Sequence, residues 1–179
     1  MHEPFSHEIV CTEASTTTMT TIRQFELNDL LKFNNVNTDI LTETYNMSFY
    51  MAYMARWSEC FLVAKAPHNS KIMGYVLGKT EGHGKLWHGH VSAVTVAPEY
   101  RRLGLAETLM RVFEDVCIQR NAYFVDLFVR NSNVLAISMY DKFGYSMYRR
   151  VLSYYSGALP EDALDMRHAL PRDVNKESI

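Results

Sequence analysis

The chain changes the period of its hydrophobic and polar positions several times, and each change marks the boundary of a predicted element. Short runs of β-branched and aromatic residues predict strands at 21–25, 60–66, 71–80, 87–97, 123–129 and 145–155. Apolar positions three and four residues apart predict helices at about 28–36, about 40–56, from residue 105 over about four turns, and at 133–143. The segment "PHNS" has a turn composition, so the second and third strands are expected to form an antiparallel hairpin.

The two ends of the chain lack these periods. Residues 1–18 are polar and include a threonine cluster, so we expect a disordered N-terminal extension. The folded domain is expected to span residues 19–157. Residues 158–179 are charged and are expected to form a peripheral C-terminal tail.

The composition mainly excludes certain classes of protein and of binding partner. A chain of 179 residues with 47% hydrophobic residues is long enough for one domain with a sizeable core. The formal net charge of −2 gives no general basic field, so we expect no direct binding to nucleic acid or to a membrane. Cys11, Cys60 and Cys117 are widely spaced, which argues against a disulfide framework and favours a reducing compartment. The sequence has no long apolar run and no signal-peptide pattern, so we expect a cytoplasmic protein.

The stretch "VSAVTVAPEYRRLGLAETLM", residues 91–110, joins a predicted strand to a predicted helix. The N–H groups that begin a helix have no partner inside it and carry a partial positive charge, so they bind phosphate oxygens. Gly104 and Ala106 keep side chains away from such a ligand, and Arg101 and Arg102 add positive charge. The turn is therefore a candidate pyrophosphate site, although an ordinary connection with two solvated arginines has the same spacing. P-loop and dinucleotide fingerprints do not occur in the sequence.

The turn "RRLGLA" matches the [RQ]-x-x-G-x-[GA] signature of the GNAT acetyltransferases, and "NSNVLAISMYDKFGY" resembles their second conserved segment. The resemblance implies an α/β (α+β) fold, the GNAT acyl-CoA N-acyltransferase fold, with a mixed, mostly antiparallel sheet of about seven strands and about four flanking helices. It implies that acetyl-CoA is the co-substrate, with its pyrophosphate on the first segment and its pantetheine and thioester beside the second. The cofactor-binding residues implied in this way are Val94, Val96, Arg101, Arg102, Leu103, Gly104, Leu105, Ala106, Asn133 and Tyr140.

Four segments spread from about residue 19 to the end resemble the catalytic subunits of NatB-type N-terminal acetyltransferases: "MTTIRQFELNDLLKFNNVNTDILTETY", "WHGHVSAVTVAPEYRRLGLA", "YFVDLFVRNSN" and "SYYSGALPEDALDMRHAL". The resemblance implies transfer of acetyl to the α-amine of nascent chains that begin Met-Asp, Met-Glu, Met-Asn or Met-Gln. It also implies a helical-repeat auxiliary subunit that docks on the first helices and brings the enzyme to the ribosome. Candidates for that surface, with core packing as the default explanation, are Leu30, Leu31, Phe33, Tyr50 and Tyr53.

The implied reaction needs only a modest base. An α-amine has an ordinary pKa of about 7.7 to 8.0, so a neutral fraction exists near pH 7. Backbone N–H groups near Val94 and Val96 are candidates to polarise the thioester carbonyl. Tyr140 is the candidate acid for the departing thiolate, and the alternative is that it packs its helix against the sheet. Asn133 and His90 complete the candidate catalytic residues.

His88 and His90 are two residues apart on a predicted strand and project to the same face. The sequence offers no third ligand except His83 in a loop, so we expect no metal site. Unless a bulge intervenes, His90 shares its face with Ser92, Val94 and Val96. The resemblance implies that His90 and Ser92 donate hydrogen bonds to the second side chain of the peptide, which disfavours an apolar residue there. His90 is also a candidate base that acts through water.

Glu43 and Tyr45 in the "TETY" loop, and Tyr154 with Tyr155, match positions that line the peptide groove in the resembled family. Their rings are expected to wall the methionine pocket, and their hydroxyls to hold the substrate backbone. One alternative is that Glu43 only caps or solvates a helix. Another is that adjacent tyrosines on a strand place one ring in the core and one outside.

Two other functions stay open on the sequence. A GNAT enzyme that acetylates internal lysines or small amines would have an open acidic groove. A non-catalytic CoA-binding subunit would lack Tyr140 or the phosphate turn, and both are present. The general base is left unassigned.

Overall fold

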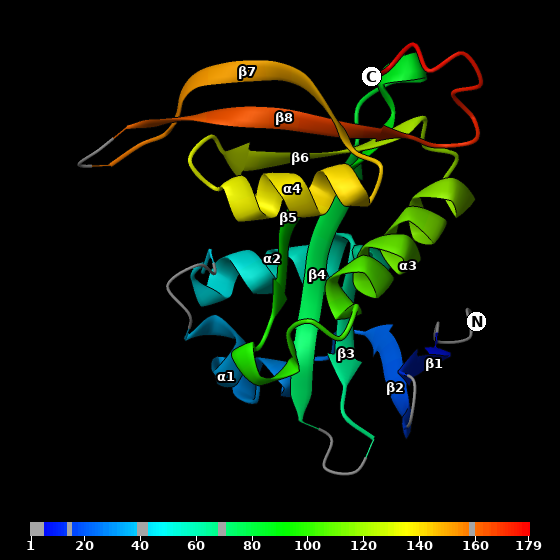
Figure 1. Ribbon diagram of the computed structural model, residues 1–179, viewed down its shortest axis with the longest axis vertical. Coiled ribbons are helices and arrows are strands. Elements are labelled where there is room, and N and C mark those ends of the chain that lie inside the picture. Colours follow the sequence, from blue (N-terminus) through cyan, green and yellow to red (C-terminus); the bar gives the residue numbers. More distant parts are fainter. Residues whose placement is uncertain (1–5, 14–15, 39–42, 68–70, 158–159) are drawn as a thin grey trace. The chain divides into compact units, whose positions relative to one another are not determined.

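The computed structural model describes residues 6–13, 16–38, 43–67, 71–157 and 160–179, with side chains from Thr20 onward. The chain divides into two compact units. Unit 1 contains residues 1–79 and 93–116, and unit 2 contains residues 80–92 and 117–179. Figure 1 labels the helices and strands of both units.

In unit 1, strands β1 to β4 are neighbours in chain order and pair antiparallel. The last residues of β5 lie beside β4, where the Ala97 N–H donates to the Met73 carbonyl at 2.8 Å. The strands are β1 Ser6–Glu13, β2 Thr16–Gln24, β3 Phe61–Lys65, β4 Ile72–Glu81 and β5 His88–Val96. The helices are α1 Asn34–Asn37, α2 Met47–Arg56 and α3 Leu105–Gln119, with 3-10 turns at Leu27–Leu31, Ser58–Cys60 and Pro98–Tyr100.

Aromatic rings fill the core of unit 1. Phe25 stacks on Phe61 with ring centroids 4.0 Å apart, and Tyr50 of α2 lies 6.3 Å from Phe61. The buried Tyr75 hydroxyl donates to Asn37 Oδ1 at 2.9 Å, so this polar group is satisfied within an apolar cluster. These contacts hold α1 and α2 against β3 and β4.

The first two helices are shorter than the sequence predicts. The segment at 28–36 is a 3-10 turn followed by the four-residue α1, which is rich in asparagine, a poor helix former. The next helix begins at Met47 because Asn46 caps it: Asn46 Oδ1 accepts from the Phe49 N–H at 2.9 Å. Residues 39–42 lie outside the described part of the chain.

In unit 2 the strand order is β5-β6-β8-β7. The first residues of β5 pair parallel with β6, while β8 pairs antiparallel with both β6 and β7. These parallel and antiparallel pairs confirm the predicted mixed sheet. The remaining elements of the unit are β6 Phe124–Arg130, α4 Val134–Lys142, β7 Ser146–Tyr155, β8 Glu161–Ala169 and a 3-10 turn at Gly84–Leu86.

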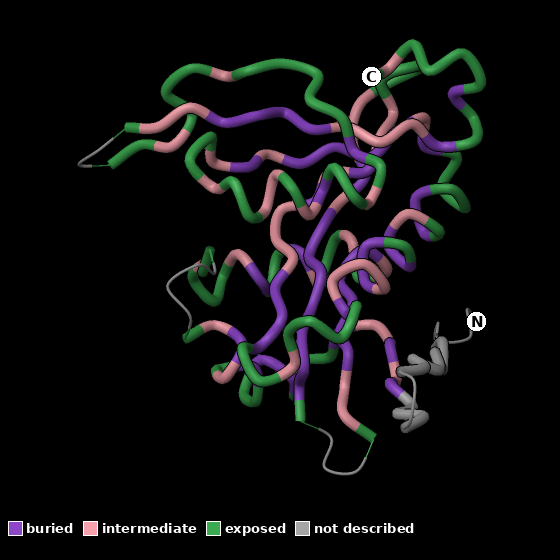
Figure 2. The backbone as a smooth tube through the Cα atoms, viewed as in Figure 1, coloured by how far each residue is buried: buried purple, intermediate pink, exposed green. Residues whose placement is uncertain are grey.

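The C-terminal segment contradicts the prediction of a peripheral tail over residues 158–179. Strand β8 lies between β6 and β7 and is buried along its middle, whereas the edge strand β7 is exposed along most of its length (Figure 2). The charges in this segment suggest a surface position, but Asp165 is fully buried and is paired with Arg167 and with the exposed Arg149, at 3.0 Å from each. Without its charged residues, the apolar positions of this segment would have predicted a strand.

The N-terminal segment also differs from its prediction. Ser6–Glu13 forms β1 and pairs with β2, where the sequence predicts disorder over residues 1–18. The pairing needs only backbone groups, which polar, threonine-rich sequences supply as well as apolar ones. Among the described residues, no helix is long and apolar enough to span a membrane, and Cys60 and Cys117 are buried.

Candidate active site

The turn before α3 belongs to unit 1 and has an unusual backbone. Its φ angles are −72° at Arg101, +66° at Arg102 and +74° at Gly104, with Leu103 outside the positive region. Two positive φ angles within three residues turn the backbone sharply here, and turns of this kind present N–H groups to anions. The turn leads directly into the 15-residue helix α3, whose first N–H groups add to it. The geometry is therefore suited to phosphate oxygens.

Glycine is needed at position 104 because of the backbone conformation there, and not because a side chain would clash. L side chains rarely adopt a φ of +74°, but a Cβ at this position would meet nothing within 4 Å. Arg102 is exposed, while Arg101 braces the turn by donating from Nε to the Val96 carbonyl at 3.1 Å. Leu105 is 3% exposed and anchors the first turn of α3, and Ala106 beside it is half-buried.

Strand β5 does not keep one face from His90 to Val96. His88, His90 and Ser92 are half-buried and alternate with buried residues. From Ser92 to Val94 three successive residues are half-buried, and Val96 is buried. The burial pattern therefore groups Ser92 with the two histidines and does not extend their face to Val96.

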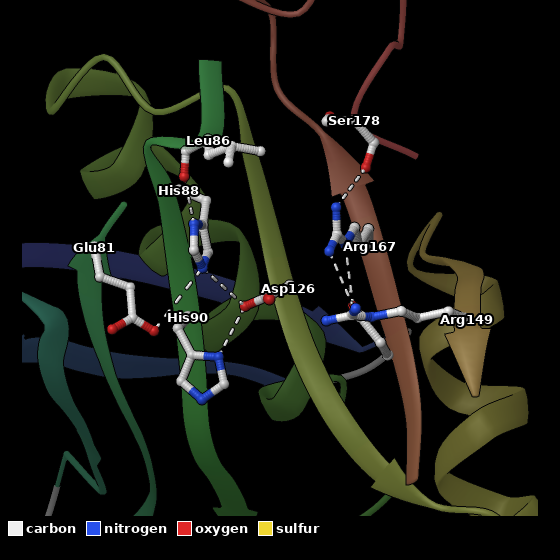
Figure 3. A network of polar contacts seen from close by, with 9 residues as sticks. Glu81, Leu86, His88, His90, Asp126, Arg149, Arg167 and Ser178 are labelled. Atoms are coloured by element: carbon white, nitrogen blue, oxygen red, sulfur yellow. Dashed lines mark hydrogen bonds and ion pairs between the residues drawn. The ribbon is translucent and has the colours of Figure 1, made fainter. Parts of the chain in front are cut away.

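Strand β6 brings a buried aspartate to His90. The two residues are register partners, and Asp126 Oδ1 lies 2.8 Å from His90 Nδ1 (Figure 3). Asp126 is 5% exposed, and its carboxylate accepts a hydrogen bond from the Nδ1–H group of His90. In that tautomer His90 Nε2 keeps a lone pair, as a general base requires. The sequence analysis missed Asp126, whose signal is a single charge within the apolar run "YFVDLFV".

A line of aromatic rings connects His90 to the two predicted groove tyrosines within unit 2. The His90 ring lies 5.7 Å from Phe128, Phe128 stacks on Tyr154 at 4.7 Å, and Tyr154 meets Tyr155 edge to face at 5.1 Å. The Tyr155 hydroxyl donates to the Phe128 carbonyl at 3.2 Å, and Arg130 lies 4.0 Å over the Tyr155 ring. The structure thus brings three of the predicted residues together.

A β-bulge explains why neighbouring tyrosines contact each other. In a regular strand they would point to opposite faces, but the β7–β8 register shifts within 151–155. Ser153 has a φ of +51°, and its N–H donates to Asp162 Oδ1 at 2.8 Å. This bond is the main reason why the pKa of Asp162 lies below its ordinary value. Neither ring is in the core: Tyr154 is 48% exposed and Tyr155 is half-buried.

Asn133 and Tyr140 are both carried by α4. Asn133 caps the helix through Oδ1, which accepts from the Ala136 N–H at 3.1 Å, and its amide NH₂ group remains a donor. Tyr140 is 8% exposed and its ring lies 5.9 Å from that of Tyr145. Burial raises the pKa of Tyr140 above its ordinary value, and Tyr155 adds to the shift. Tyr140 is therefore a protonated phenol at neutral pH.

The predicted groove residues of the "TETY" loop belong to unit 1. Glu43 is exposed, and Thr42 lies outside the described residues. Tyr45 stacks on Phe49 of α2 at 4.2 Å, and its N–H donates to the Tyr50 hydroxyl at 3.2 Å. The structure thus fixes Tyr45 on the aromatic face of α2.

Core packing explains most of the predicted partner surface. Of the five candidates only Leu31 is exposed, at 78%. The other four are buried: Leu30, Phe33, Tyr50 and Tyr53. The exposed apolar side chains on these elements are instead Leu27, Leu31, Met47 and Met51.

Comparison with known proteins agrees with this geometry. The sequence pattern of the acetyltransferase (GNAT) family matches residues 27–145. The N-terminal acetyltransferase B complex catalytic subunit NAA20 of Arabidopsis thaliana is 62% identical over 162 residues, or 90% of this chain and 91% of that protein. The crystal structure of Chaetomium thermophilum Naa20 in complex with a bisubstrate analogue has a TM-score of 0.81 at 43% identity and covers 88% of this chain and 90% of that one. The NatB acetyltransferase complex bound to CoA and MES has a TM-score of 0.77 at 42% identity, with coverage of 84% and 99%.

These matches cover most of both chains, and the predicted GNAT fold is confirmed. The chain belongs to the GNAT acetyltransferase family and, within it, to the catalytic subunits of N-terminal acetyltransferase B. Its enzyme class is accordingly that of the protein N-terminal α-acetyltransferases.

Proposed function

We propose that this chain transfers the acetyl group of acetyl-CoA to the α-amine of nascent proteins that begin Met-Asp, Met-Glu, Met-Asn or Met-Gln. The observation that carries the proposal is the turn from Arg101 to Gly104, whose alternating φ angles precede α3. A pyrophosphate is a natural ligand for such a turn. The related NatB complex bound to CoA supports this choice of ligand.

The proton chemistry is assigned to His90 and Tyr140. His90 Nε2 takes a proton from the α-amine, directly or through water, and Asp126 on Nδ1 stabilises the imidazolium that forms. The neutral amine attacks the thioester carbon, the attacking nitrogen releases its second proton to solvent, and the C–S bond breaks as the amide forms. Because its pKa is raised, Tyr140 keeps its proton and donates a hydrogen bond to the departing thiolate, which takes its proton from solvent. The amide of Asn133 is a second donor in unit 2.

Recognition of the peptide is assigned to two groups of side chains. In unit 2, the Ser92 hydroxyl, and His90 once Nε2 has taken its proton, donate to a second side chain that accepts hydrogen bonds, which an apolar side chain cannot do. Tyr154 and Tyr155 supply ring surface beside His90. In unit 1, Glu43 and Tyr45 are assigned to the peptide on the strength of the family resemblance.

The proposal includes a partner. A helical-repeat auxiliary subunit docks on the first helices and brings the enzyme to the ribosome in the cytoplasm, with no direct contact to nucleic acid or membrane. The solved NatB complexes support an auxiliary subunit. The exposed Leu27, Leu31, Met47 and Met51 are the apolar side chains available for such a contact.

A peptide panel tests the function. The chain, co-expressed with its auxiliary subunit, is incubated with labelled acetyl-CoA and peptides that begin Met-Asp, Met-Asn, Met-Leu or Ser-Glu, or that carry only an internal lysine. We expect transfer to the Met-Asp and Met-Asn peptides. Preference for Met-Leu or lysine would overturn the roles of His90 and Ser92, and CoA binding without any transfer would favour a non-catalytic subunit.

A further inference from the structure

A second group of polar side chains surrounds His88 in unit 2 (Figure 3). One carboxylate oxygen of Glu81 and one ring nitrogen each of His88 and His90 lie within 4.8 Å of one another. Asp126 joins them, because its Oδ1 lies 3.6 Å from His88 Nε2 and 2.8 Å from His90 Nδ1. We propose that this group, two histidines and two carboxylates, is a binding site for a divalent transition-metal ion such as Zn²⁺.

His88 is oriented as a metal-binding histidine should be. Its Nδ1 lies 2.7 Å from the Leu86 carbonyl, so Nδ1 carries the hydrogen and Nε2 presents its lone pair. The ring is held flat on Phe124, with centroids 4.7 Å apart and 3° between the planes. The turn that presents the carbonyl needs Gly82, where φ is +98° and a Cβ would collide with the Leu86 oxygen. The nitrogen is therefore positioned before any ion binds.

The distances and charges also suit a metal. Zinc bonds of about 2.0–2.1 Å in a tetrahedron place neighbouring ligand atoms about 3.3 Å apart. His88 Nε2 is 3.6 Å from Asp126 Oδ1 and 3.9 Å from Glu81 Oε1, both within about 0.6 Å of that spacing. Two carboxylates carry two negative charges, which a divalent cation neutralises.

This group could not be predicted from the sequence, because its members come from separate strands. His88 and His90 lie on β5, Glu81 ends β4, and Asp126 lies on β6. The sequence offers His83 as the only further histidine nearby, and His83 is not a member of the group found among the described residues. The third ligand is a glutamate that the fold supplies.

An ion at this site would affect the proposed reaction, and this consequence rests on the proposed function. The His90 nitrogen beside Asp126 is Nδ1, so an ion bound to it would replace its hydrogen and break the hydrogen bond to Asp126. Zn²⁺ is therefore expected to inhibit acetyl transfer. Glu81 and His88 have no assigned part in transfer, so their substitution separates metal binding from catalysis.

Metal binding is measured directly on the full chain in the complex in which it is purified, after chelator treatment. Calorimetric titration with Zn²⁺ and visible absorption with Co²⁺ compare the unchanged chain with Glu81→Gln, His88→Gln and the matched control His83→Gln. We expect Glu81→Gln and His88→Gln each to lose one equivalent of ion or to weaken its binding at least thirtyfold. His83→Gln should bind as the unchanged chain does.

Each outcome decides the proposal. Equal binding by all four proteins, or no stoichiometric binding by any, would overturn the metal site. Glu81 is half-exposed, so Glu81→Gln is expected to fold even if His88→Gln does not. Inhibition of transfer by Zn²⁺ that Glu81→Gln relieves would extend the result to catalysis, while failure of transfer in every sample would count against the proposed function alone.

Discussion

The phosphate turn at residues 101–106 and the ring-lined group around His90 are built in opposite ways. The turn is continuous in sequence, and the atoms that would hold a ligand are backbone N–H groups positioned by φ angles. The group around His90 takes side chains from β5, β6 and β7, and its backbone matters only through strand register and one bulge. The comparison shows that a site formed by consecutive residues can be predicted from the sequence, whereas a site formed by side chains from separate strands cannot.

The largest effect is expected at Tyr140 of α4, the proposed hydrogen-bond donor to the departing thiolate. Tyr140→Phe should lower kcat about a hundredfold, because removing one donor to a developing charge typically has that effect, while KM for both substrates changes little. Tyr145→Phe, at a similarly buried neighbouring ring, is the control and should keep kcat within about twofold. Steady-state kinetics with a Met-Asp peptide give both values, and equal losses would show that Tyr140 only packs.

The second prediction tests the turn by comparing two glycines that both have a positive φ. Gly104→Ala and Gly84→Ala both place a Cβ at positive φ in open space, so each should destabilise the fold by about 1 kcal/mol. Only Gly104→Ala should raise KM for acetyl-CoA, by about tenfold, because the strain tilts the N–H groups away from the phosphates. If both variants raised it equally, the turn would be an ordinary connection.

A smaller effect is expected from the exposed rings of β7. Tyr154 and Tyr148 are exposed to nearly the same extent, 48% and 47%, but Tyr154 stacks on Phe128 while Tyr148 lies under Arg167. Tyr154→Ala should raise KM for the peptide about fivefold, or about 1 kcal/mol, and leave KM for acetyl-CoA unchanged. Tyr148→Ala should change neither, and an equal effect of both would place the peptide elsewhere.

The smallest effect concerns the bulge itself. Ser153 has a φ of +51°, so Ser153→Gly should stabilise the fold by about 0.5 kcal/mol, the strain relieved less the added entropy of glycine in the unfolded chain. Peptide KM should not change, because the Ser153 N–H to Asp162 bond and the strand register persist. Urea unfolding and peptide kinetics measure both, and a raised peptide KM would mean that the serine side chain, and not the bulge, positions Tyr154.

The order of elements was largely predictable. The hairpin of β3 and β4, helix α3, strand β6 and helix α4 lie where the hydrophobic period places them, because that period is a short-range property. The lengths of the first two helices were overestimated. The second begins only at Met47, since the cap at Asn46 outweighs the apolar spacing before it. Strand β8 was missed because Asp165 and its arginines look like surface charges until the fold pairs them.

The sequence by itself determined the connection from strand to helix around residues 101–106 and the family, and it singled out Tyr140 as a candidate, because each depends on residues close together in the chain. Only the tertiary structure decided that Asp126 supports His90, that Glu81 faces His88, and that the rings of Tyr154 and Tyr155 touch. The physical reason is strand register: a shift of one residue turns every side chain to the other face, and register is set by packing and by bulges far from the residues concerned.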